Sequence, residues 1–116
     1  MLEIRKEVVD PDIAVLHCSG RIAMGRSCED IEAQVDELIR ERMTKVILDL
    51  TEVQRVDSTG FGTVVQCSQK LKIAGGQLRV VGATGMVEEI AHTSHIPTIV
   101  PFHATLAEAV AAFAPA

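Results

Sequence analysis

The sequence predicts one α/β domain, a sandwich of about five strands and four helices in the order ββαβαβαβα. Two observations predict this class: short apolar runs alternate with amphipathic stretches of helical spacing, and no linker, repeat or low-complexity tract separates them. Strand–helix–strand units of this length require parallel pairing with right-handed crossovers, whereas a tight turn joins the first two strands. We therefore expect a mixed sheet with an antiparallel strand at one edge.

The first two strands are expected to form an antiparallel hairpin. Residues Leu2 to Val9 alternate between apolar and charged side chains, which is typical of a half-exposed strand. The turn signal Asp10-Pro11-Asp12 follows. The apolar run from Ile13 to Cys18 is the second strand, which we expect Gly20 to end.

The remaining elements alternate between helices and buried strands. Hydroxyl residues followed by a carboxylate three positions later, Ser27 with Asp30 and Thr105 with Glu108, predict capping boxes at the first and last helices. Two consecutive glycines predict the end of the second helix. We expect a helix at 27–42, a strand at 46–50, a loop at 51–57, a helix at 59–74, a strand at 78–81, a helix at 84–95, a strand at 98–100 and a terminal helix from 105.

Composition excludes several classes of function. The 116 residues carry 11 Lys and Arg against 16 Asp and Glu, a net charge of −5, and three Phe with no Trp or Tyr. This balance argues against nucleic-acid binding, which needs basic charge for phosphates and aromatic rings for bases. No apolar run approaches the ~18 residues of a membrane span, so we expect no membrane insertion. Three widely spaced cysteines without a CxxC pair argue against a disulfide framework or a zinc knuckle, and we expect a cytoplasmic protein without metal or cofactor.

The segment DSTGFG, from Asp57 to Gly62, lies where a buried strand is expected to lead into a helix. Ser58 is a good N-cap residue, so we expect its hydroxyl to accept hydrogen bonds from the unpaired amides of the first turn. Gly60 and Gly62 each weaken that turn by about 1 kcal/mol relative to alanine. Such a helix start is expected where a neighbouring element or a partner approaches the backbone closely.

The same segment lacks the spacing of catalytic and nucleotide-binding motifs. A nucleophile elbow needs a glycine two residues before the serine, and Val56 stands there. The P-loop consensus is absent, and the third glycine of a dinucleotide-binding loop is missing. Because the Asp57–Ser58 pair has no histidine at a predictable distance to act as a base, we expect no enzymatic activity.

The run VILDL, the short loop, the DSTGFG segment and the amphipathic helix ending at Ala74-Gly75-Gly76-Gln77-Leu78 resemble the STAS domains, specifically the bacterial anti-sigma factor antagonists. The resemblance covers essentially the whole chain, so residues 1–116 are expected to be a single STAS domain. It implies a regulatory module that binds and sequesters an anti-sigma factor.

The resemblance also implies roles for individual residues. Ser58 would be phosphorylated by the partner, which is both anti-sigma factor and serine-protein kinase, and phosphorylation would switch binding off. A PP2C-type phosphatase would reset the switch. Asp57 and Thr59 would flank the phosphoacceptor at the docking surface, Gly60 would let the partner approach the helix start, and Phe61 is the one aromatic ring near that surface.

One departure from the family pattern concerns the residues after the second strand. Many anti-sigma factor antagonists have G-x-[LIV]-D there, whereas this chain has Ala23 in place of the acidic residue. Arg21 and Arg26 bring positive charge to the region, and either could pair with a phosphate on Ser58. Two alternatives therefore stay open: a non-switching STAS scaffold or accessory subunit of a signalling complex or transporter, and a STAS domain that senses a small ligand.

Overall fold

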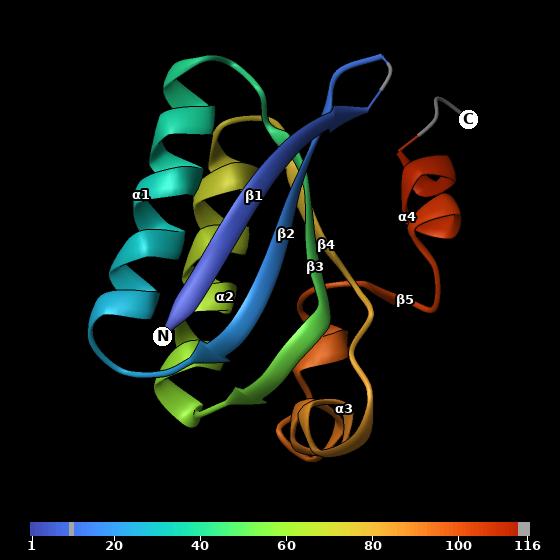
Figure 1. Cartoon of the computed structure of the whole chain (residues 1–116). Helices are drawn as coiled ribbons and strands as arrows, with labels where there is room; N and C mark the ends of the chain where they lie inside the picture. The colour runs from blue at the N-terminus through green and yellow to red at the C-terminus, as the bar shows by residue number, and fades with distance from the viewer. Residues whose placement is uncertain (10, 114–116) are drawn as a thin grey trace.

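The computed structural model, which describes residues 1–9 and 11–113, contains the predicted mixed sheet and four α-helices (Figure 1). The strands lie side by side in the order β1-β2-β3-β4-β5; β1 pairs antiparallel with β2 and the other pairs are parallel. The predicted fold class is thus confirmed. The elements are β1 Leu2–Val9, β2 Ile13–Ile22, α1 Arg26–Arg40, β3 Lys45–Val56, α2 Ser58–Ile73, β4 Gln77–Val81, α3 Gly85–Thr93, the 3₁₀ helix η1 Ile96–Thr98, β5 Phe102–His103 and α4 Leu106–Ala112.

The sheet is covered unequally on its two faces. Helices α1 and α2 lie next to each other on one face, where the larger hydrophobic core forms (Figure 1). On the opposite face α4 packs over the beginnings of the strands through Ala109, in contact with a smaller cluster that includes Val15 and Ile47. No helix among the described residues is both long enough and apolar enough to cross a membrane.

Strands β2 and β3 both extend past their predicted ends. The positive φ of Gly20, +108°, lies next to a register shift in the pairing of β2 with β3 rather than at the end of β2, and a Cβ there would clash with the Met1 carbonyl oxygen. The predicted loop at 51–57 is mostly strand, because the extension of β3 pairs with the extension of β2 through Ile22 and Val56. Val53 and Val56 are buried, so their spacing of three residues matches a bulged strand rather than a loop.

One predicted helix cap and one predicted strand are wrong. Helix α1 begins at Arg26 after Gly25 without a side-chain cap, because the Ser27 hydroxyl bonds back to the Ala23 backbone instead. The predicted strand at 98–100 is instead the last residue of η1, which has a proline in its first turn, followed by a turn, and the last strand is β5. The capping residue of α4 is correct: the Thr105 hydroxyl accepts from the Glu108 amide at 3.2 Å.

Candidate functional site

The DSTGFG segment lies at one edge of the sheet, where β3 ends and α2 begins. The loop between β2 and α1 lies beside it, because β2 and β3 are parallel neighbours whose last paired residues are Ile22 and Val56. The Asp57 amide donates to the Ile22 carbonyl oxygen at 3.1 Å, which joins the two segments directly.

Asp57, rather than Ser58, is the N-cap of α2. One carboxylate oxygen accepts from the Gly60 amide at 2.6 Å, and the other accepts from the Met24 amide at 3.0 Å. These backbone donors, Gly60 first and Met24 second, hold the pKa of the Asp57 carboxyl below its usual value. Both residue types are good caps, but the carboxylate can bind two amides at once, one on each side of the junction.

Ser58 is consequently the first residue of α2, and its side chain is exposed together with that of Thr59. Since Asp57 provides the capping oxygen, the Ser58 hydroxyl is not needed to hold the helix start together. The exposed hydroxyl lies at the positive end of a helix dipole, where additional negative charge is tolerated.

The two glycines have different surroundings. A Cβ on Gly60 would lie 2.6 Å from the Ile22 carbonyl oxygen and 2.9 Å from a methyl carbon of Val56, so a neighbouring strand requires this glycine. A Cβ on Gly62 would meet no atom within 4 Å, and the residue is exposed. Packing within the domain therefore explains Gly60 and does not explain Gly62.

Phe61 does not lie on the surface. Its side chain is 3% exposed and belongs to the larger core, together with Val64 and Leu71 of the same helix. The helical repeat turns the ring inward, so it supplies no exposed aromatic anchor. Of the residues implied for partner binding, Ser58 and Thr59 are exposed, Asp57 is half-buried, and Gly60 and Phe61 are buried.

The two arginines implied as phosphate neighbours lie in the same region, but one is exposed to solvent and the other contacts a carboxylate of its own helix. Arg21 is exposed next to the end of β2, and Arg26 is exposed with its Nε 3.7 Å from the Asp30 carboxylate. Their loop adjoins Asp57 through the Met24 amide. Within the described residues no hydrogen bond or ion pair joins either guanidinium to the Ser58 side chain.

Sequence reasoning missed Met24, whose side chain is 75% exposed beside this junction. The loop that carries it is fixed at two points: the Met24 amide donates to Asp57, and the Ser27 hydroxyl both accepts from the Ala23 amide and donates to the Ala23 carbonyl oxygen, at 2.8 Å each. An apolar residue followed by glycine within a polar loop was the signal available in the sequence.

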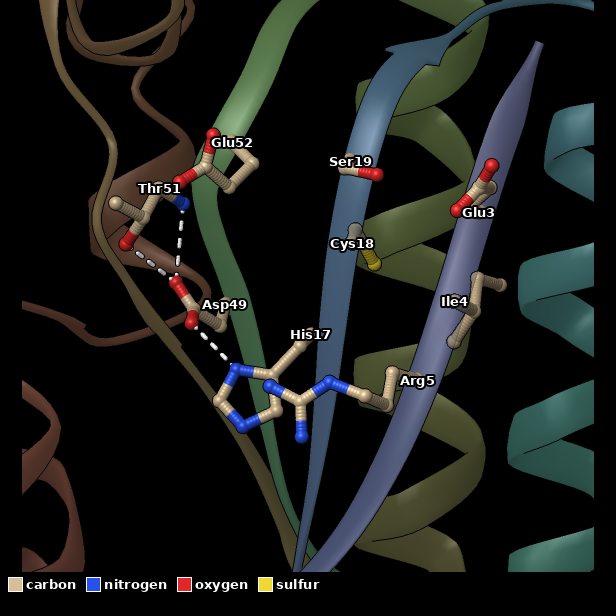
Figure 2. A pocket seen from close by; sticks show the side chains of 9 residues that line it. All are labelled: Glu3, Ile4, Arg5, His17, Cys18, Ser19, Asp49, Thr51 and Glu52. Atoms are coloured by element: carbon tan, nitrogen blue, oxygen red, sulfur yellow. Dashed lines mark hydrogen bonds and ion pairs between the residues drawn. The ribbon is translucent and has the colours of Figure 1, made fainter.

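A second polar cluster occupies the sheet between β1, β2 and β3 (Figure 2). The two ring nitrogens of His17 lie 2.6 Å from an Asp49 carboxylate oxygen and 2.7 Å from a Glu7 carboxylate oxygen. Burial raises the pKa of Asp49, but hydrogen bonds from the hydroxyl and amide of Thr51 outweigh it, and the net shift is downward. The cluster thus ties three strands together with its polar atoms already paired.

The cysteines and histidines form no metal centre in the part of the chain that the structure describes, where no group of three or more ligating side chains is found. The three cysteines are buried and unpaired with one another. Burial raises the pKa of both Cys18 and Cys67 to about 12, so these thiols are neutral at physiological pH.

Comparison with known proteins gives consistent matches. The family model of the STAS domain matches residues 5–109. A Thermotoga maritima protein provisionally named an anti-sigma factor antagonist is 27% identical over 75 residues, which make up 65% of this chain and 66% of that protein.

Two solved structures share the fold over nearly the whole chain. The crystal structure of an anti-sigma factor antagonist from Mycobacterium paratuberculosis has a TM-score of 0.85 and 21% identity, covering 97% of this chain and 93% of that one. The phosphorylated form of the Bacillus cell fate determinant SpoIIAA has a TM-score of 0.73 and 19% identity, covering 97% of this chain and all, 100%, of that one.

Proposed function

Because this chain belongs to the STAS domain family, we propose that it is a cytoplasmic anti-sigma factor antagonist whose binding is controlled by phosphorylation of Ser58. The observation that carries the proposal is the exposed Ser58 side chain at the first position of α2, with the capping function already supplied by Asp57. Because the Ser58 hydroxyl does not cap the helix, it can be modified without loss of the helix start.

The partner class follows from relatives of this chain. The Thermotoga maritima relative carries the name of an anti-sigma factor antagonist, and SpoIIAA is known in a phosphorylated form. We therefore assign the partner as an anti-sigma factor that is also a serine-protein kinase, which would transfer the γ-phosphoryl group of ATP to the Ser58 hydroxyl oxygen with ADP as the leaving group and release of the hydroxyl proton. A PP2C-type phosphatase would restore the hydroxyl.

Phosphorylation is expected to act on the interface rather than on the fold. A phosphoserine adds a charge of roughly −1.5 to −2 and three acceptor oxygens. The first-turn amides and the helix dipole accommodate this charge within the domain, whereas a partner that packs against a neutral hydroxyl would have to bury it. A hundredfold loss of affinity corresponds to only ~2.8 kcal/mol, which an ill-paired buried charge readily exceeds.

The presence of Ala23 in place of the acidic residue of the family pattern is compatible with the proposed docking surface. The Ala23 backbone is held by the Ser27 hydroxyl and accepts from the Cys28 thiol at 3.1 Å, so the loop keeps a defined shape without a carboxylate there. The exposed part of this surface is formed by Met24, Ser58 and Thr59.

The proposal is tested by incubating the protein with each serine-kinase anti-sigma factor of the source genome and ATP, followed by mass spectrometry of the Ser58 peptide. Ser58→Ala should remove the phosphate and keep binding. Ser58→Asp should weaken binding about a hundredfold while the melting temperature stays close to that of the wild type. Ser94→Asp, at an exposed serine after α3, is the matched charge control and should leave binding unchanged.

Three outcomes would count against the switch. Binding that is equal in the wild type and in Ser58→Asp would remove phosphorylation as the control and favour a non-switching scaffold. Unfolding of Ser58→Asp would contradict the argument from the helix dipole. A wild type that binds none of these kinases would contradict the assignment of the partner.

A further inference from the structure

A surface groove lies between the N-terminal turns of α1 and α2, which run next to each other (Figure 1). We call it the α1–α2 groove and define it by Met24, Glu29, Glu32, Thr59, Gly62 and Gln66. Its volume is about 510 Å³. Thr59 places the groove one residue from Ser58, but the Ser58 side chain does not line it.

Gly62 lines this groove with backbone alone. No atom lies within 4 Å of the place a Cβ would take, so nothing inside the domain requires a glycine. A glycine inside a helix lowers stability relative to alanine. The visible effect of the missing side chain is that the groove stays open on the α2 side.

The charge of the groove is one-sided. Its two charged lining residues are Glu29 and Glu32, both acidic. Elsewhere on α1, Asp30 is paired with Arg26 at 3.7 Å and Asp36 with Lys70 at 3.1 Å. Within the described residues neither groove glutamate forms an ion pair, so their carboxylates are available to a cation from outside.

Met24 gives the groove an apolar rim on a loop whose backbone is held in place before binding. The side chain is 75% exposed, while its backbone amide is fixed to the Asp57 carboxylate at 3.0 Å. An apolar surface next to a carboxylate suits the long side chains of lysine and arginine, whose aliphatic stems pack on apolar surface while the charged head reaches an acid. Preorganisation of the loop reduces the ordering cost of such a contact.

We propose that the α1–α2 groove binds a lysine or arginine side chain of the protein partner, with the stem on Met24 and the backbone of Gly62 and the charge on Glu29 and Glu32. This inference deepens the proposed function and rests on it, because it names the chemistry by which the partner docks next to Ser58. The partner would then make two contacts: one in the groove that does not depend on phosphorylation, and one at Ser58 that does.

The groove is tested without the partner by titrating the ¹⁵N-labelled protein with N-acetyl-leucyl-lysine amide and following backbone amide shifts. We expect saturable shifts at Gly62, Thr63 and Gln66 with a millimolar dissociation constant. Gly62→Gln, which places a helix-compatible side chain in the groove, should weaken binding at least fivefold. Gln69→Gly, on an exposed position of the same helix, introduces a glycine outside the groove and should leave binding unchanged.

Charge is tested in the same titration. The double variant Glu29→Gln with Glu32→Gln should also weaken binding at least fivefold, and N-acetyl-leucyl-glutamate amide should produce no saturable shift. Absence of saturable shifts with the lysine peptide, or equal shifts with the glutamate peptide or in Gly62→Gln, would overturn the proposal. Ser58→Asp should still bind the lysine peptide, which separates the groove from the phosphorylation switch.

The partner supplies the second arm. A serine-kinase anti-sigma factor that binds the wild type should bind Gly62→Gln about tenfold more weakly, and added salt should reduce its wild-type affinity. Unchanged affinity for Gly62→Gln would overturn the assignment of the groove to the partner. Failure of every such kinase to bind the wild type would instead contradict the proposed function, while the peptide titration would still decide the chemistry of the groove.

Discussion

Replacing Gly62 by alanine should make the domain more stable, although the residue lies at the edge of the proposed docking surface. The new Cβ would meet no atom within 4 Å, so the substitution introduces no clash. It removes the extra backbone freedom of a glycine in the unfolded chain and thereby contributes about 1 kcal/mol. For a domain of 116 residues this corresponds to a rise in melting temperature of roughly 3–5 °C.

The matched comparison is Gly60→Ala in the same helix turn. Its Cβ would lie 2.6 Å from the Ile22 carbonyl oxygen, which belongs to the backbone of β2 and cannot rotate away. We expect a loss of about 1–3 kcal/mol, the usual range for overpacking. Differential scanning calorimetry and urea unfolding of both variants, together with the wild type, measure the contrast directly.

The reasoning fails if Gly62→Ala is neutral or destabilising, because this result would show that the glycine does not weaken the helix. It fails equally if Gly60→Ala is as stable as Gly62→Ala, because the approach of Ile22 would then not require the smaller residue. Opposite signs at two glycines two residues apart would show that one serves the fold and that the other does not.

Three further predictions concern ionisable groups and thiols. Asp57→Ala should lower the melting temperature and speed amide hydrogen exchange at both Met24 and Gly60, whereas Asp57→Asn, which keeps one acceptor oxygen, should preserve one of these hydrogen bonds and speed exchange at the other amide alone; equal exchange at both amides in the two variants would refute the role of the carboxylate as a double acceptor. Burial and the nearby positive charge of Arg79 lower the pKa of His103, so protonation opposes folding and stability should fall as the pH drops below 6.5, the ordinary pKa of histidine. Between pH 7.5 and 5.5 the melting temperature of His103→Gln should fall less than that of the wild type, and an equal fall would contradict this prediction. Because burial raises the pKa of Cys18 and Cys67 to about 12, neither should react with Ellman's reagent at pH 8 until denaturant unfolds the chain, as mass spectrometry of the labelled peptides would show; rapid labelling of the native protein would disprove their burial.

The sequence predicted the order of the elements because its apolar runs are short and separated by clear helical repeats. It predicted that Asp57 to Gly62 lie where a strand leads into a helix, because these residues directly follow a buried apolar run, and the structure places them at the junction of β3 and α2. It misassigned the helix cap because Asp57 and Ser58 are both good capping residues in local terms. The choice between them is made by the Met24 amide, which is 33 residues away and reaches Asp57 only in the folded sheet.

The remaining errors have the same origin in contacts distant along the chain. The second half of β3 looked like a loop because its polar residues mask the bulged pairing with β2. Ser27 looked like a helix cap until its hydroxyl was seen to serve the preceding turn. Phe61 was expected near the docking surface because the sequence alone does not show which face of the helix the sheet covers. The α1–α2 groove forms between two helices that are separate in the sequence, and its one local sign in the sequence is Gly62, a glycine within a predicted helix.

The junction at Asp57 also has a consequence for the stage of folding at which another protein can recognise Ser58. The beginning of α2 depends on three contacts with one stretch of β2 and its following loop: the Asp57 amide on Ile22, the Asp57 carboxylate on Met24, and the fit of Gly60 against Ile22. These contacts form only after the parallel pairing of β2 with β3 is complete, a long-range step that is slow compared with helix formation. We therefore expect Ser58 to reach its presented geometry late in folding, so that an enzyme recognising this geometry would act on folded molecules rather than on nascent chains.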